Sequence, residues 1–273
     1  MTSTVVSGRV FIIAGSDSGG GAGIQADIKA VTALGGYAMT AITALTAQNT
    51  RGVHGVHPVP PDFVRHQMDA VMDDLGADVL KTGMLHDIDT IDCVVELLDG
   101  PGGGIPVVVD PVMVSQSGSR LLDHGAVDHL IRHLLPRATL LTPNLPEAEV
   151  LLGRTIDGVD AMGSAACELN REVGGAVLLK GGHLEGEMIV DVLATPDNVV
   201  RFQHERIRTN HTHGTGCTLA SAIATGLAQG QSLDDAVDRG RRYLLEAIRT
   251  APGLGGGDGP VNHSHTVDPR RSM

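Results

Sequence analysis

Short, continuously apolar runs alternate with helix-like stretches between residues 10 and 180. The runs are rich in Val, Ile and Leu without polar alternation, which is typical of strands buried on both faces. They span 10–14, 37–47, 77–80, 106–109, 138–141 and 176–179. The helix-like stretches between them span 24–34, 63–75, 87–98, 125–135, 145–152 and 161–173. This alternation predicts βαβ units and a mostly parallel sheet covered by helices.

The pattern changes after Lys180. Two apolar runs, 188–194 and 199–207, are joined by Thr-Pro-Asp-Asn and predict an antiparallel hairpin at the edge of the sheet. Two further helices are expected at 219–230 and 233–248. The stretch 253–273 is rich in Gly, Pro, His and charge, so we expect an extended or frayed tail. Because no repeat or linker composition appears, residues 1–273 are expected to form a single α/β domain.

Composition excludes several classes of partner. The net charge is −12, so the protein's field repels nucleic acid and anionic lipid. Three Phe, two Tyr and no Trp leave few rings on which unpaired bases could stack. No apolar run approaches the ~18 residues of a membrane span. The three cysteines are far apart, which fits a reduced compartment. We therefore expect a cytoplasmic protein that binds neither nucleic acid nor membrane.

Polar side chains follow nearly every predicted strand. Because parallel strands deliver their carboxyl ends to one edge, where open α/β sheets bind ligands, these side chains are the first candidates for chemistry. In chain order they are Gln48 and Asn49, Lys81 and Thr82, Asp110, Thr142 and Asn144, and Lys180.

The glycine-rich loop 15–23 follows the first strand. It lacks the Gly-Lys-Ser/Thr ending of a Walker A loop. Its loose match to a dinucleotide-binding fingerprint lies too far into the predicted helix, and the next strand ends in Gln48 rather than in a carboxylate. A simple tight turn is one interpretation. We favour a loop that folds over a small substrate, since glycine permits close backbone approach.

A second glycine loop, 212–218, directly precedes an apolar helix. The amides of Gly214, Thr215 and Gly216 are expected to bind an anion there, such as a phosphoryl group in transfer. A thiol at a helix N-terminus has a lowered pKa, so Cys217 is a candidate base or nucleophile. The alternative is an ordinary threonine cap beside a buried, inert cysteine.

Asn144 and Glu147 have the spacing of a helix capping box. The functional alternative places both near a hydrated Mg²⁺ that bridges nucleotide phosphates, with Asp110 helping to hold the metal. Lys180, followed by two glycines, can reach a phosphate, although a solvated lysine is the simpler interpretation. The histidines have no metal-site spacing, and no structural zinc is expected.

Seven motifs, in order, resemble those of the hydroxymethylpyrimidine/phosphomethylpyrimidine kinases of thiamine biosynthesis, in the ribokinase-like superfamily. The matching segments span 14–27, 46–50, 81–85, 110–113, 142–147, 180–183 and 212–218. This resemblance implies a ribokinase-like three-layer α/β/α sandwich with a mostly parallel central sheet and an edge hairpin. It also implies that Mg-ATP phosphorylates 4-amino-5-hydroxymethyl-2-methylpyrimidine and then its monophosphate.

The resemblance also implies roles for individual residues. Gln48 stands where the family reads the aminopyrimidine, and a primary amide offers the donor and acceptor that this requires. Cys217 stands where ribokinase-like sugar kinases carry an aspartate base. The positions implied to line the substrate pocket are Gly15, Ala22, Asp27, Met84 and Val112.

Three questions stay open at this level. A pyridoxal or pyridoxine kinase of the same superfamily is the nearest alternative, and a pyrimidine-binding sensor without catalysis is an alternative from another class. The segment 239–243 departs from the lysine and aromatic residues expected in the last helix, so the cation that it sends to the phosphates is undefined. Ribokinase-like kinases are often homodimers, and the hairpin after Lys180 is the expected dimer edge.

Overall fold

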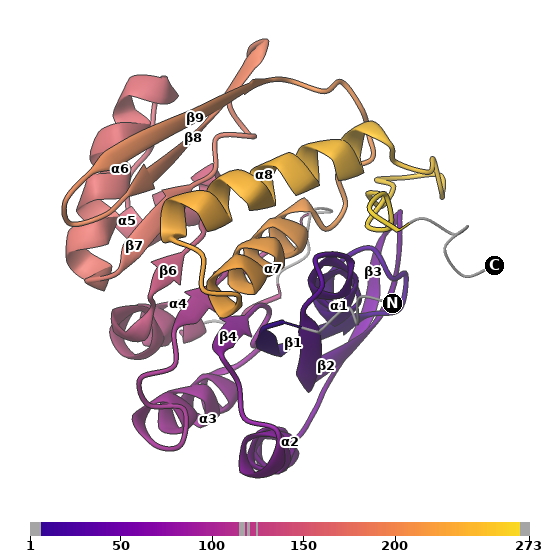
Figure 1. Cartoon of the computed structure of the whole chain (residues 1–273), viewed down its shortest axis with the longest axis vertical. Helices are drawn as coiled ribbons and strands as arrows, with labels where there is room; N and C mark the ends of the chain where they lie inside the picture. Colours follow the sequence, from indigo (N-terminus) through magenta and orange to yellow (C-terminus); the bar gives the residue numbers. More distant parts are fainter. Residues whose placement is uncertain (1–6, 115–117, 119–120, 124, 268–273) are drawn as a thin grey trace, which may run out of the picture.

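The computed structural model describes residues 7–114, 118, 121–123 and 125–267. Nine strands in this part of the chain form one sheet, in the order β3-β2-β1-β4-β5-β6-β7-β8-β9 (Figure 1). The strands are β1 (Arg9–Asp17), β2 (Tyr37–Asn49), β3 (Gly52–Pro58), β4 (Val79–Thr82), β5 (Val107–Val109), β6 (Leu140–Leu141), β7 (Ala176–Leu179), β8 (Met188–Ala194) and β9 (Val199–Glu205). The helices are α1 (Gly23–Ala33), α2 (Pro61–Asp74), α3 (Ile88–Asp99), α4 (Ala126–His129), α5 (Leu145–Leu152), α6 (Gly158–Val173), α7 (Thr215–Ala228) and α8 (Leu233–Arg249).

The six strands from β2 to β7 in this order run parallel, as the buried apolar runs predict. Strands β8 and β9 pair antiparallel at one edge, which confirms the expected hairpin. At the other edge β3 pairs antiparallel with the long strand β2. The carboxyl ends of the parallel strands therefore share one edge of the sheet.

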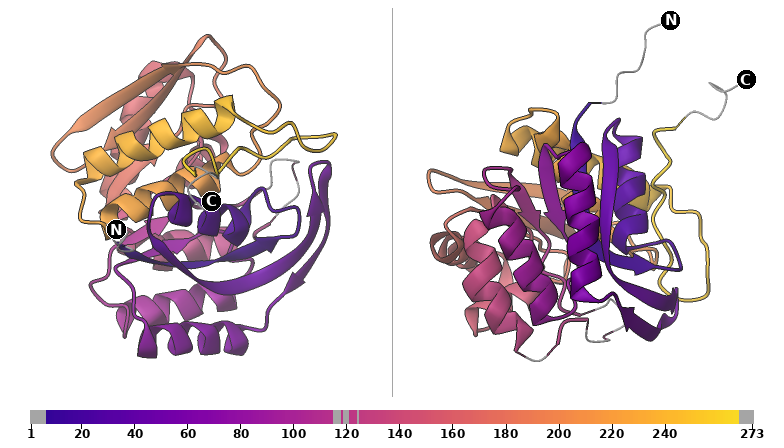
Figure 2. Two further views of the ribbon diagram at one scale, coloured as in Figure 1. Left: turned by 45° about the vertical axis from the view of Figure 1, so that its right-hand side comes forward. Right: turned by 90° about the horizontal axis from the view of Figure 1, so that it is seen from below.

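Alternate residues of β1 show how the layers form. Phe11 and Ile13 pack into the apolar cluster that contains α2, α3 and α6, whereas Val10 and Ile12 pack into the cluster that contains α1, α7 and α8. All four side chains are fully buried. Figure 2 shows the helices on both faces of the sheet. The predicted three-layer α/β/α sandwich is confirmed.

Three elements differ from the sequence prediction. Strand β3 was not expected, because its Gly, His and Pro content resembles a loop; pairing with β2 orders it. The helix expected at 125–135 is a short α-helix that passes into a π turn and a 3₁₀ turn, which contains Pro136. Helix α7 begins at Thr215 rather than at 219, so Cys217 lies in its first turn.

The segment 253–267 has no helix or strand, but it is not frayed. Val261 and His263 are buried, and Tyr243 of α8 donates a hydrogen bond to the His263 carbonyl at 2.6 Å. The amide of His213 donates to the Gly259 carbonyl at 3.1 Å. Of the extended or frayed tail that was expected, the frayed alternative is therefore wrong as far as residue 267; residues 268–273 lie outside the described part.

None of the helices in the described residues is long and apolar enough to cross a membrane.

Candidate active site

The carboxyl ends of β5, β6 and β7 bring together Asp110, Thr142 and Lys180. Lys180 Nζ lies 3.1 Å from Asp110 Oδ1, and the Thr142 hydroxyl donates to the same oxygen at 3.1 Å. Burial alone would lower the pKa of Lys180, but the carboxylates of Asp110 and Glu147 outweigh it and raise that pKa. Lys180 is therefore a fixed positive charge at this edge rather than a solvated lysine.

Helix α7 starts beside this lysine. Gly214 caps the helix with φ +80°, and Thr215 is its first residue. A methyl group on Gly216 would lie 3.3 Å from Lys180 Nζ and 3.6 Å from Asp110 Oδ2. Because the first amides of a helix have no acceptor within it, the start of α7 adds positive potential to that of Lys180. The two features are together suited to binding an anion.

The pKa of the Cys217 thiol is shifted in the opposite direction to the sequence prediction. Its pKa is raised to about 12, because burial and the charges of Asp27 and Asp110 outweigh the stabilisation of a thiolate by Lys81 and by the Gly23 amide. A lowered pKa was predicted from the helix N-terminus alone, which includes neither burial nor these two carboxylates. In the free protein Cys217 therefore carries its proton.

A fully buried ion pair lies close to Cys217. Lys81 Nζ is 3.0 Å from both carboxylate oxygens of Asp27, and the Ser221 hydroxyl donates to Asp27 at 2.6 Å. Burial alone would lower the pKa of Lys81, but the Asp27 carboxylate reverses this and raises it. Both charged side chains have no exposed surface. The Asp27 carboxylate is therefore committed to Lys81 and Ser221, and its place in the substrate pocket stays a prediction.

Asn144 and Glu147 form the capping box of α5. The Glu147 amide donates to Asn144 Oδ1 at 2.9 Å, and the Asn144 amide donates to Glu147 Oε2 at 2.8 Å. Burial and the nearby charge of Asp110 raise the pKa of Glu147 to about 7, despite the opposing charge of Lys180. Within the described residues no three His, Cys, Asp or Glu side chains converge to hold a metal.

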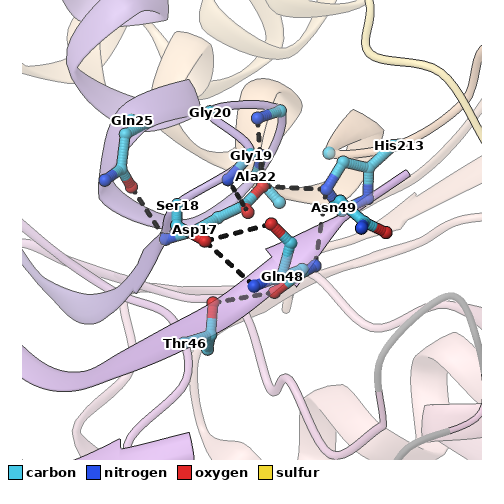
Figure 3. A network of polar contacts seen from close by, with 12 residues as sticks. Asp17, Ser18, Gly19, Gly20, Ala22, Gln25, Thr46, Gln48, Asn49 and His213 are labelled. Carbon is cyan, nitrogen blue, oxygen red and sulfur yellow. Dashed lines mark hydrogen bonds and ion pairs between the residues drawn. The ribbon is translucent and has the colours of Figure 1, made fainter. Parts of the chain in front are cut away.

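Asp17, the last residue of β1, organises the first glycine loop (Figure 3). Its carboxylate accepts hydrogen bonds from the amides of Gly19 (2.8 Å), Gly21 (3.0 Å) and Ala22 (2.8 Å). It also accepts one from His213 Nε2 at 2.9 Å. Burial would raise the pKa of Asp17, but the bonds from His213 and the amides outweigh it and lower that pKa. The loop is folded around an ionised carboxylate.

Gln48 lies near the end of β2, beside this loop. The Thr46 hydroxyl is 3.1 Å from Gln48 Oε1, and His213 Nε2 is 3.5 Å from Gln48 Nε2. The backbone N–H of Gln48 donates to the Ser18 hydroxyl at 2.9 Å, which ties β2 to the first glycine loop. The side chain expected to read a pyrimidine therefore lies beside His213 of the second glycine loop, on a strand that is bonded to the first.

The other expected pocket residues lie around the strand ends. A methyl group on Gly15 would lie 2.5 Å from the Met84 methyl carbon, so these two positions touch. Ala22 caps α1, and Val112 lies with Asp110 along a small cavity at the end of β5. Gly15, Met84 and Val112 thus lie at the ends of β1, β4 and β5.

Sequence reasoning gave no role to Asp17 or His213. They lie 196 residues apart in the chain, so no local motif pairs them. A usable signal existed for Asp17, since Asp followed by Ser and Gly commonly accepts hydrogen bonds from the next amides. No comparable signal marks His213.

A fixed lysine, a helix N-terminus and buried carboxylates at the carboxyl edge of a doubly covered sheet are suited to holding a phosphoryl group during transfer. Together with the three-layer sheet, they define a ribokinase-like kinase.

Comparison with known proteins narrows this class. The chain belongs to the phosphomethylpyrimidine kinase family, whose sequence model matches residues 17–262. It is 46% identical over 262 residues to a hydroxymethylpyrimidine/phosphomethylpyrimidine kinase of Streptomyces coelicolor, covering 96% of both chains. It is 54% identical over 256 residues to the thiamine biosynthesis bifunctional protein ThiED of Geobacter sulfurreducens. That match covers 94% of this chain but only 52% of the bifunctional protein.

Two solved structures are similar in fold. The phosphomethylpyrimidine kinase of Clostridium difficile has a TM-score of 0.77 and 41% identity, with 88% of this chain and 99% of that chain covered. The pyridoxal kinase of Bacillus subtilis, in an ADP complex, has a TM-score of 0.87 and 36% identity, with 94% and 98% covered. Fold similarity alone therefore does not separate pyrimidine from pyridoxal as the substrate.

Proposed function

We propose that this chain phosphorylates 4-amino-5-hydroxymethyl-2-methylpyrimidine with Mg-ATP and then phosphorylates the monophosphate to the diphosphate, in thiamine biosynthesis. The observation that carries the proposal is the convergence of Lys180, Asp110 and the start of α7, on a chain of the phosphomethylpyrimidine kinase family. Gln48 supplies the donor and acceptor groups for an aminopyrimidine edge.

Each residue of the site has a role in this proposal. Lys180 and the amides of Gly216 and Cys217 hold the transferred phosphoryl group and stabilise its charge. Cys217 accepts the proton of the substrate hydroxymethyl group. Because its raised pKa keeps a proton on sulfur in the free protein, that proton must first pass to solvent; the thiolate that remains is then a strong base, since its conjugate acid has a high pKa. The buried Lys81 favours the thiolate from below.

The chemistry of the carboxylates fits Mg²⁺. The proximity of Asp110 contributes to the raised pKa of Glu147, and a divalent cation beside these groups would relieve that repulsion. Asn144 and Glu147 are committed to their capping box, so we assign them, with Asp110, to a metal held largely through water and phosphate oxygens. Bound Mg²⁺ would neutralise charge on the nucleotide phosphates.

Phosphorus NMR tests the activity directly. Purified protein with Mg-ATP and the hydroxymethylpyrimidine should give the monophosphate and then the diphosphate. Cys217→Ala should lower kcat about 100-fold or more with little change in pyrimidine binding. Cys167→Ala, a cysteine on α6 away from the site, is the matched control. Full turnover by Cys217→Ala would remove the base assignment, and pyrimidine binding without any phosphorylation would favour the sensor.

Pyridoxal is the second candidate substrate, because the fold matches a pyridoxal kinase as closely as a pyrimidine kinase. Both rings carry a hydroxymethyl group that the same machinery could phosphorylate. Competition between pyridoxal and the pyrimidine in one assay decides between them. A higher kcat/KM for pyridoxal would overturn the pyrimidine assignment.

We also propose a cytoplasmic homodimer. Strand β9 is the outermost strand on its side of the sheet, and its side chains alternate between exposed and half-buried positions, which leaves a backbone edge open for pairing. The proposal places this edge at the dimer contact. Light scattering that reports a monomer at assay concentrations would refute it.

A further inference from the structure

The contact between Asp17 and His213 fixes where the imidazole carries a hydrogen. All four groups around the Asp17 carboxylate are N–H donors: the amides of Gly19, Gly21 and Ala22, and His213 Nε2. An ionised carboxylate cannot donate in return, so His213 Nε2 must carry a hydrogen in either charge state of the ring. That hydrogen is committed to Asp17 at 2.9 Å.

The ring is held in this position from a second side. A methyl group on Gly21 would lie 2.4 Å from His213 Cδ2, so the imidazole packs directly on the glycine backbone. The side chain of His213 is only 12% exposed. The ring therefore has little freedom to turn its other nitrogen toward Gln48.

The carboxamide of Gln48 lies beside the His213 ring. His213 Nε2 lies 3.5 Å from Gln48 Nε2, but it offers no lone pair because its hydrogen points at Asp17. On the other side the Thr46 hydroxyl lies 3.1 Å from Gln48 Oε1 and 3.0 Å from the Ser16 carbonyl. One hydroxyl proton serves one acceptor at a time, so Thr46 alone cannot fix the carboxamide. Because two N–H groups repel each other, the His213 N–H disfavours the Gln48 amino group beside it and favours the exchanged orientation, with the Gln48 oxygen toward His213 and the amino group toward the Thr46 hydroxyl.

We propose that His213, held by Asp17, is a specificity-determining residue that keeps the Gln48 carboxamide in one orientation, so that the site accepts a 4-aminopyrimidine and rejects the matching 4-oxopyrimidine. This rests on the proposed function, and it adds the group that makes the recognition selective.

The selectivity follows from the two edges of the ligands. A 4-aminopyrimidine presents an acceptor at N3 beside an amino donor, whereas the 4-oxo ring presents an N3–H donor beside a carbonyl acceptor. A carboxamide that rotates freely satisfies either pattern by exchanging its oxygen and nitrogen. A carboxamide fixed in one orientation pairs with one pattern and leaves donors facing donors in the other. Each unpaired buried group weakens binding by about 5- to 150-fold.

Kinetics on the two substrates test this. Wild-type protein should prefer the 4-amino over the 4-oxo compound by about 100-fold or more in kcat/KM, which corresponds to two mismatched groups. His213→Leu, similar in volume but without a donor, should bring the two values within about tenfold of each other. His213→Gln restores an N–H near the position of Nε2 and should recover most of the preference.

The control is another histidine–aspartate pair. His129 Nε2 lies 2.6 Å from Asp92, with His129 on α4 and Asp92 on α3. His129→Leu removes a similar pair and should leave the preference unchanged. An unchanged preference in His213→Leu overturns the proposal, as does a wild-type protein that treats both compounds alike.

Two measurements keep the proposal separate from the activity. If wild-type protein phosphorylates neither compound, the proposed function fails, and titration calorimetry with both compounds still shows whether binding discriminates between them. Long-range proton–nitrogen NMR of the wild-type protein reports the tautomer without any variant. A His213 ring protonated only at Nδ1 would overturn the proposal even if His213→Leu does not fold.

Discussion

Cys217 should react with alkylating reagents more slowly than a thiol of ordinary pKa. The structure raises its pKa from 9.0 to about 12, so at neutral pH the thiolate is about a thousandfold scarcer. The scarcer thiolate is also more nucleophilic, by roughly 20- to 30-fold over three pKa units. The net expectation is a rate about 30- to 50-fold below that of an ordinary thiol, before any steric shielding.

The pH profile separates this cause from shielding. Protein without nucleotide is treated with iodoacetamide between pH 6 and pH 10, and mass spectrometry follows the peptides that contain Cys217 and Cys167. Shielding lowers every rate equally, whereas a pKa of about 12 makes the logarithm of the Cys217 rate rise by about one per pH unit over the whole range. A plateau below pH 9 would refute the reasoning and restore the thiolate predicted from sequence.

Three further variants test the charges and the backbone of the site. Lys81→Met leaves the Asp27 carboxylate buried without its partner, so the free energy of unfolding measured in urea should fall by about 3–5 kcal/mol. The double variant Lys81→Met/Asp27→Leu should recover most of this loss. An unchanged urea midpoint in the single variant would contradict this. The pKa of Glu147 is about 7 in the folded protein and lower in the unfolded chain, so the folded state binds this proton more tightly. The free energy of unfolding of the wild-type protein should therefore fall as pH rises from 4.5 to 7, by on the order of 2 kcal/mol. Glu147→Gln, which can keep the capping box, should lose this dependence, and urea curves at pH 5.5 and 8.5 that keep it would refute the assignment. Gly214→Ala places a methyl carbon 1.8 Å from the Gly21 carbonyl oxygen, at a residue with φ +80°, so kcat should fall about 100-fold or more in the phosphorus NMR assay. Wild-type turnover in this variant would show that the glycine loops 15–23 and 212–218 need not touch.

The sheet could be predicted because its central strands are buried on both faces. The run Val107–Val109 has no polar residue, and such runs bounded by helical patterns admit few other structures. Strand β3 could not be predicted in this way, since most of its side chains are exposed and pairing with β2 is what orders it. Prediction failed where tertiary pairing overrides local composition.

The candidate site was predictable as a set of strand ends but not as a network. Asp110 follows β5 and Lys180 follows β7, the two parallel strands on either side of β6, so their proximity could be anticipated from topology. The protonation of Cys217 could not, because its raised pKa comes mainly from burial in the fold, with Asp27 and Asp110 adding to it from other elements. The pairing of Asp17 with His213 likewise depends on how the two glycine loops meet in the fold.

Two of the three helices that cover one face of the sheet, α7 and α8, are synthesised after all of its strands, whereas α1 is synthesised early. Val10 of β1, Val79 of β4 and Val108 of β5 belong to the cluster that Leu219 and Ile223 of α7 complete. During synthesis the strands and α1 emerge first, so the part of this apolar face that α7 and α8 cover stays open to water until residues 215–249 have left the ribosome. A nascent chain paused before α7 therefore lacks the phosphate-binding loop and carries an exposed, adhesive surface. A chaperone is therefore most needed before α7 and α8 have been synthesised.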